Sequence, residues 1–167
     1  MPLRDLDAAE RTATADERTT LEAFLDHYRD LIKRKVGGVS EEDARRRLVP
    51  SATTLGGLIK HLRWVEYRWF QLVLPGVAFE QTTGADRLAE FGMTDDETVA
   101  GLVAAYDEQC ARSRTSAARY QLTDVGHRGE IGEVSLRWIY LHLIEETARH
   151  AGHADILREQ LDGMTGD

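Results

Sequence analysis

Apolar residues recur at intervals of three and four over four long stretches of this sequence, which restricts the chain to helical folds. The periodicity predicts helices over residues 16–36, 54–73, 95–117 and 133–161. Only the segment 120–125 has an extended character, and it is too short to predict a strand. Because each apolar stripe needs a partner to bury it, the sequence predicts an all-α domain built as a four-helix bundle.

The residues between the stripes predict where helices begin and end. Ser40 is a good N-cap for a short connecting helix that ends near Pro50. Thr94 and the glutamate three residues after it form a capping box, so the third long helix is expected to begin at residue 95. The roughly 18 residues before Thr94 lack periodicity and fit a crossover along the bundle. Residues 124–130 contain two glycines and are expected to form a loop.

Composition narrows the class of protein. The 167 residues, 42% apolar and 30% charged, are expected to form one globular domain over residues 1–167, with residues 1–15 as a loosely ordered N-terminal segment. The net charge of −8 argues against a nucleic-acid partner, because phosphate binding needs a basic patch. The polar N-terminus is unlike a signal peptide, and the apolar runs are too short to cross a membrane. The single cysteine, Cys110, is expected to be buried and fits a cytoplasmic location.

The stretch HLIEETARHAGH places a glutamate and a histidine on the inner side of the fourth predicted helix. At about 100° per residue, His150 falls in the middle of the apolar stripe and Glu146 falls inside it one turn earlier. Glu145 points to the opposite side, and His142 and His153 lie on the flanks. A buried, unpaired carboxylate costs several kcal/mol, so Glu146 is expected to be paired or to bind a metal ion.

His61 lies at the edge of the apolar stripe of the second predicted helix, where it can meet Glu146 and His150 inside the bundle. Two imidazoles and a carboxylate, with a coordination position left open, suit Zn²⁺, Fe²⁺, Ni²⁺ or Mn²⁺. Two other interpretations remain open. Glu146 and His150 also fit an ordinary i,i+4 ion pair, and a single histidine near an apolar stripe also fits a hydrogen-bonded core residue.

Two stretches, TTLGGLIKHLRWVEYRWF (53–70) and SLRWIYLHLIEETARHAGHADILREQLDG (135–163), resemble an actinobacterial branch of the DinB-like (DNA-damage-inducible) superfamily. The resemblance implies a four-helix bundle with up-down-down-up connectivity and a long crossover between the second and third helices. It also implies a divalent metal ion held by His61, Glu146 and His150. Many relatives carry histidine at the position of Glu146, and a glutamate there is similar to the N-terminal domain of mycothiol-dependent maleylpyruvate isomerase.

The leading hypothesis from these features is a metal-dependent transferase, related to thiol S-transferases, that acts in detoxification. Its cofactors would be a divalent ion (Zn, Ni, Fe or Mn) and mycothiol or another low-molecular-weight thiol, and its partners would be that thiol and an electrophilic small molecule. His142 and His153 are candidates for orienting a ligand or carrying a proton, and Tyr67 and Arg149 are candidates for contact with the thiol.

Three further expectations complete the sequence-based picture. The aromatic residues of the second helix are compatible with a homodimer. A non-catalytic metal-binding protein of a stress response is an alternative function. A metal-assisted hydrolase that uses the same open coordination position is another.

Overall fold

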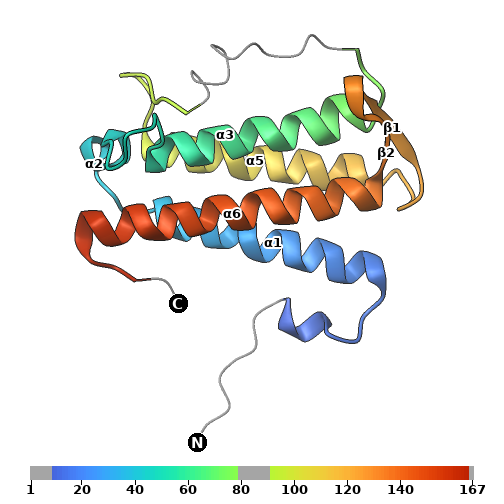
Figure 1. Cartoon of the computed structure of the whole chain (residues 1–167). Helices are drawn as coiled ribbons and strands as arrows, with labels where there is room; N and C mark the ends of the chain where they lie inside the picture. Colours follow the sequence, from blue (N-terminus) through green and yellow to red (C-terminus); the bar gives the residue numbers. More distant parts are fainter. Residues whose placement is uncertain (1–8, 79–90, 166–167) are drawn as a thin grey trace, which may run out of the picture.

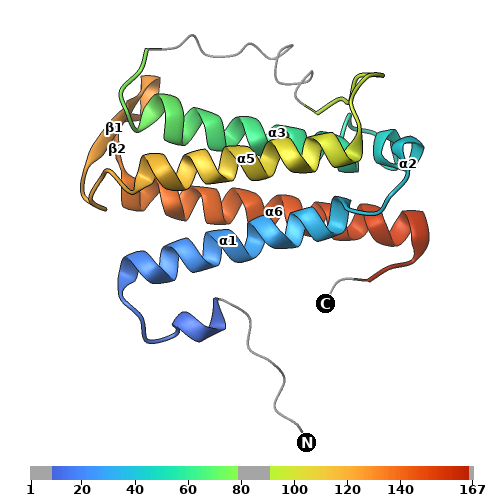
Figure 2. The same cartoon turned by 180° about the vertical axis from the view of Figure 1, so that it is seen from behind.

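Four long helices lie side by side in the part of the chain that the computed structural model describes, residues 9–78 and 91–165. Figure 1 shows α3 and α6 in front, and Figure 2, turned by 180°, shows α5 and α1 in front. The predominantly helical character predicted from the periodicity is confirmed. In chain order the long helices are α1 (Glu17–Val36), α3 (Leu55–Tyr67), α5 (Val99–Ala117) and α6 (Leu136–Asp162).

Two predicted segments lie partly outside the described residues. In the N-terminal segment 1–15, residues 1–8 lie outside the described residues. Glu10–Thr12 form a 3₁₀ turn, η1. Within the predicted crossover before Thr94, residues 79–90 are outside them. Among the helices that are described, none has the length and apolar character required to cross a membrane.

Side-chain N-caps start each α-helix of the described chain. In each case a side-chain oxygen accepts a hydrogen bond from the backbone N–H three residues later, which satisfies one donor that the helix leaves unpaired. Ser40 caps the short helix α2 (Glu41–Arg45), as predicted. The full set of caps is Asp16, Ser40, Thr54, Thr98 and Ser135.

The third long helix begins at Val99 and not at residue 95 as predicted. The capping-box bond forms, because the Thr94 N–H donates to Glu97 Oε2 over 2.8 Å, but the residues between them make only a turn. Thr98 takes the cap position, and the Val99 N–H donates to the carboxylate of Glu41 in α2. This tertiary contact with α2 favours the later start.

A short β-hairpin precedes α6, so the prediction of a loop at 124–130 without strands is wrong. Strand β1 (Val125–Arg128) pairs antiparallel with β2 (Gly132–Ser135) around the 3₁₀ turn η3 (Gly129–Ile131). Strands of four residues are too short to show alternating polarity in the sequence. Their pairing also delays the start of α6, which was expected at residue 133.

The second long helix continues to Val73, as predicted, but its last six residues form a π-helix, η2 (Arg68–Val73). Its backbone bonds span five residues, as in Leu74 N–H to Trp69 O at 3.0 Å. Pro75 has no N–H to donate to the Phe70 carbonyl, and the Ser116 hydroxyl donates to that oxygen instead over 2.7 Å. Pro75 therefore accounts for the helical bond that Phe70 lacks.

The hairpin packs closely on the end of this π-helix. A Cβ added at Gly126 would lie 2.2 Å from the Val73 carbonyl oxygen, so only glycine allows the approach. Trp69 and Phe70, both in η2, are buried in the core. The hairpin contacts both η2 and α6.

The predicted apolar stripe of α6 is confirmed, and two leucines provide a direct test of its phase. Leu143 is 0% exposed and Leu141 is 54% exposed. Leu143→Ala is expected to lower the free energy of unfolding by about 2–5 kcal/mol, because it leaves a cavity in the core. Leu141→Ala is expected to change it by less than about 0.5 kcal/mol. Urea denaturation followed by circular dichroism measures both, and equal effects would refute this assignment of the helix faces.

Candidate metal centre

Three side chains predicted to bind a metal ion meet between α3 and α6. His61 Nε2 lies 3.3 Å from Glu146 Oε1, and His150 Nε2 lies 3.2 Å from the same oxygen. One ligand atom from each of the three residues lies within 4.8 Å of the other two. We call His61, Glu146 and His150 the triad.

The packing of α3 against α6 brings the three triad side chains together. Glu146 and His150 are one turn apart on the inner face of α6, and His61 faces them from α3. Leu62 on α3 and Leu143 on α6 are fully buried next to them, so both helices are held in phase by the core. Each triad side chain is mostly shielded from solvent.

The charges around the triad favour an ionised carboxylate. Hydrogen bonding to His150, and then to His61, holds the pKa of the Glu146 carboxyl well below its usual range. The second carboxylate oxygen, Oε2, accepts a hydrogen bond from Arg149 over 3.0 Å. Glu146 therefore turns one oxygen to the two imidazoles and the other to a guanidinium.

This donor set fits a divalent first-row metal ion. Two imidazole nitrogens and one carboxylate oxygen are suitable ligands for Zn²⁺, Fe²⁺, Ni²⁺ or Mn²⁺. The i,i+4 contact of Glu146 with His150 exists, but that pair alone does not explain why His61 from another helix joins it. His153 lies behind the triad, with its Nδ1 3.4 Å from Nδ1 of His150.

A cavity of about 280 Å³ opens beside the triad, and two of the triad residues, His61 and Glu146, line it. Its other described lining residues are mainly aromatic or cationic. They come from α3, η2, the hairpin, α6 and the segment before α5. They include Arg68, Trp69, Phe91, Arg128, Trp138 and His142.

The model of the family described as Mycothiol-S-transferase matches residues 20–163. The chain belongs to the mycothiol-S-transferase family. This family is DinB-like, which confirms the predicted superfamily.

One solved structure has a similar fold. This member of the mycothiol-S-transferase family is similar to a conserved protein from Enterococcus faecalis, with a TM-score of 0.63 and 14% sequence identity. The similarity covers 90% of this chain and 100% of the other chain. No curated protein matches the sequence.

The two flanking histidines predicted as functional residues differ in position. His142 lines the cavity between Trp69 and Trp138, with ring centroids 4.8 Å and 5.1 Å from theirs. Burial lowers the pKa of His142, which favours its neutral form. His153 is exposed and is not among the residues that line this cavity, although it contacts His150.

The two residues predicted to contact the thiol, Tyr67 and Arg149, lie in different surroundings. Tyr67 is at the surface, where its ring packs edge-on against Trp64, and it is not among the described residues that line the cavity. Arg149 forms ion pairs with Glu146 and with Glu145, its exposed neighbour. The structure therefore associates Arg149 with the triad carboxylate.

Several lining residues were not predicted. Arg128 belongs to the hairpin, which the sequence pattern did not reveal. Trp69 and Trp138 lie on or beside apolar stripes, and such residues look like ordinary core in a sequence. The aromatic spacing around His61 and His142 was the available signal, but only the fold shows that these rings surround one cavity.

Cys110 is buried in α5, as predicted. Burial, with a smaller contribution from Glu66, raises the pKa of its thiol to about 12. A thiol with so high a pKa is neutral at physiological pH and is a poor nucleophile. The cavity beside the triad does not include Cys110 among its described lining residues.

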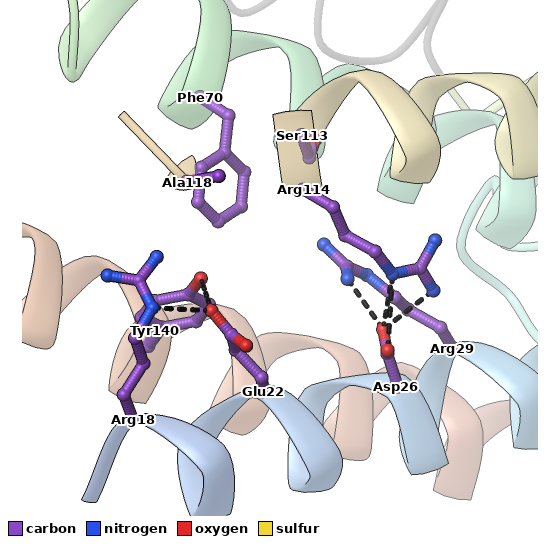
Figure 3. A pocket seen from close by; sticks show the side chains of 9 residues that line it. All are labelled: Arg18, Glu22, Asp26, Arg29, Phe70, Ser113, Arg114, Ala118 and Tyr140. Atoms are coloured by element: carbon purple, nitrogen blue, oxygen red, sulfur yellow. Dashed lines mark hydrogen bonds and ion pairs between the residues drawn. The ribbon is translucent and has the colours of Figure 1, made fainter. Parts of the chain in front are cut away.

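A second cavity, of about 350 Å³, is lined by residues of α1, η2, α5 and α6 and includes two groups of ion pairs (Figure 3). At one end Arg18 pairs with Glu22, and at the other Asp26 pairs with both Arg29 and Arg114. These contacts join charged groups of the protein to one another.

Proposed function

We propose that this member of the mycothiol-S-transferase family is a divalent-metal-dependent transferase. It would activate a low-molecular-weight thiol, mycothiol or a close analogue, for attack on an electrophilic small molecule, as a detoxification reaction. The observation that carries this proposal is the position of His61 and Glu146 in the wall of a cavity. A metal site that faces a cavity leaves room for a substrate, whereas a structural site is closed by protein ligands.

In this proposal His61, Glu146 and His150 hold the metal ion. A bound divalent ion lowers the pKa of a thiol that coordinates it, which makes the thiolate available at neutral pH. Arg149 holds Oε2 of Glu146 and thereby directs Oε1 toward the two imidazoles. His153 contacts Nδ1 of His150 and fixes the orientation of that ring, leaving Nε2 for the metal.

The reaction forms one bond from sulfur to carbon. The electron pair comes from the thiolate, and the leaving group departs with the electron pair of the bond that breaks. The thiol proton passes to a base or to solvent, and His142 is the candidate base within the cavity. The reaction needs no oxidant or reductant, and the protein's own thiol, Cys110, takes no part.

Three further features belong to this proposal. The four long helices form a bundle with up-down-down-up connectivity. The protein acts in the cytoplasm, where small thiols are kept reduced. It forms a homodimer in solution, for which exposed Trp64 and Tyr67 on α3 provide apolar surface.

Thiol transfer can be measured directly with monochlorobimane, which becomes fluorescent when a thiol displaces its chloride. Tag-free, metal-loaded protein is expected to accelerate the reaction of mycothiol well above the uncatalysed rate. Glu146→Gln should abolish this acceleration, and Cys110→Ala should retain it. No acceleration with mycothiol or with any of a panel of small thiols would refute the proposed function, as would a full rate for Glu146→Gln.

A further inference from the structure

The cavity beside the triad is bordered by two stacked pairs of rings. The ring centroids of His61 and Phe91 are 4.3 Å apart, with 19° between the ring planes. Those of His142 and Trp138 are 5.1 Å apart, with 15° between the planes. The first pair contains the triad residue His61 and the second contains His142, and all four rings line the cavity. A flat aromatic group, the Phe91 ring, therefore lies directly against one of the imidazoles proposed to bind the metal ion.

Trp69 adds a third aromatic group at a deeper position. Its side chain is 2% exposed, and its ring lies 4.8 Å from His142 and 5.3 Å from Trp138, measured between centroids. Trp69 belongs to the π-helix η2, whose altered backbone spacing sets where this ring emerges. Aromatic rings attract other planar π-systems by stacking and edge-on contact, in addition to the burial of apolar area. The cavity thus favours a flat conjugated molecule over a saturated one of equal size.

The charged groups of the cavity favour an anion. Its described lining residues include two arginines, Arg68 and Arg128, and one carboxylate, Glu146. The guanidinium carbon of Arg128 lies 4.3 Å from the centre of the Trp69 ring. Glu146 is already bonded to the histidines and to Arg149. Among the described lining residues, cationic side chains therefore outnumber anionic ones in a chain of net charge −8, and the planar guanidinium of an arginine matches the geometry of a carboxylate.

We propose that this cavity binds the electrophile, and that the electrophile is a planar conjugated molecule that carries a carboxylate or a similar anionic group. That the bound molecule is the electrophile of the reaction rests on the proposed transferase function, whereas the preference for planar anions does not. The aromatic rings select the planar part, and Arg128, with Arg68, selects the anionic group. The electrophilic carbon is thereby held next to the triad.

A calorimetric titration with three unreactive molecules tests this preference without catalysis. The molecules are 1-naphthoate, which is planar and anionic, 1-naphthamide, which is planar and neutral, and cyclohexanecarboxylate, which is anionic and not planar. We expect 1-naphthoate to bind at least about tenfold more tightly than either of the others. The amide lacks the charge-assisted hydrogen bond to an arginine, and the cyclohexane ring lacks stacking with the aromatic residues. Equal affinities, or no detectable binding of 1-naphthoate, would overturn the proposal.

Two pairs of variants locate the binding. Trp138 and Trp64 are exposed to similar extents, 39% and 42%, but only Trp138 lines the cavity. Trp138→Leu is expected to weaken 1-naphthoate binding severalfold, and Trp64→Leu to leave it unchanged. Arg128→Gln should remove the preference for 1-naphthoate over 1-naphthamide, whereas Arg112→Gln, at an exposed site on α5, should retain it. Equal effects within either pair would contradict the proposed site.

A metal ion at the triad could also bind the carboxylate of 1-naphthoate, and removal of the metal distinguishes this explanation from binding by the arginines. Protein treated with a chelator is expected to keep the preference for 1-naphthoate, because the arginines provide it. Loss of the preference on chelation would overturn the role of the arginines. If 1-naphthoate binds as expected but thiol transfer is absent, the cavity preference stands and the proposed function fails. If thiol transfer occurs and the three molecules bind equally, only the preference fails.

Discussion

Replacing Glu66 by alanine is expected to lower the free energy of unfolding by about 3–5 kcal/mol. Glu66 on α3 is 1% exposed and accepts two hydrogen bonds of 2.7 Å from Arg29 on α1, which is 3% exposed. Burial alone would lower the pKa of Arg29, but the facing carboxylate more than offsets this and holds the pKa well above its ordinary value. The variant leaves a charged guanidinium in the core, with only Asp26 as its remaining carboxylate partner in the described structure.

The control for this effect is an ion pair at the surface. Glu108 and Arg112 on α5 form an i,i+4 pair in which both side chains are mostly exposed. Glu108→Ala is expected to change stability by less than about 1 kcal/mol. The double variant Arg29→Met with Glu66→Leu should recover most of the loss, because an apolar pair replaces the charges. Urea denaturation measures all three, and similar losses for Glu66→Ala and Glu108→Ala would show that the buried pair has no special role.

The second large effect concerns metal binding by two adjacent glutamates. Glu146 faces the triad, whereas Glu145 is exposed and contacts Arg149. Glu146→Gln and His150→Ala are each expected to weaken binding of a divalent ion by more than about 100-fold, since groups that only orient ligands already contribute about 10–100-fold. Glu145→Gln should have little effect, because Arg149 can still bond to Glu146.

Elemental analysis of tag-free protein, after dialysis against a competing chelator, measures this contrast. The wild type and Glu145→Gln should retain about one divalent ion per chain, and Glu146→Gln and His150→Ala should retain almost none. Undiminished metal in His150→Ala would remove that residue from the site. Equal losses of metal in Glu145→Gln and Glu146→Gln would contradict the claim that only Glu146 binds the ion.

Much of the helical architecture was predictable from the sequence, because the burial of one helix face imposes a periodic pattern. The phase of α6 put Glu146 and His150 inside and Glu145 outside, and the structure agrees. Phase also put His61 near the inner side of its helix. The period of the α-helix was therefore enough to predict that the triad residues could meet.

Features that depend on contacts between distant segments were not predictable in this way. The later start of α5 depends on the carboxylate of Glu41, more than fifty residues away, which accepts a bond from Val99. The hairpin strands are too short to leave a pattern, so the position of Arg128 was also hidden. The Phe70 carbonyl in the π-helix accepts its bond from the Ser116 hydroxyl, which comes from another helix, so this contact also left no local pattern.

The buried pair of Arg29 and Glu66 shows the same limit. Each residue lies at a position that the apolar pattern alone assigns to the inner side of its helix, but charged residues are usually at the surface. Only the packing of α1 against α3 shows that the two charges face one another in the core. In the same way, the contact of Arg149 with Glu146 Oε2 became visible only in the folded structure.

The central claim is that His61, Glu146 and His150 share one metal ion at the edge of the cavity. An anomalous-difference map from crystals of tag-free, metal-loaded protein, recorded at the absorption edge of the ion, tests it most directly. We predict one strong peak within about 2.0–2.2 Å of Nε2 of His61, Oε1 of Glu146 and Nε2 of His150. No peak at this position, or a peak held by other residues, would contradict the claim.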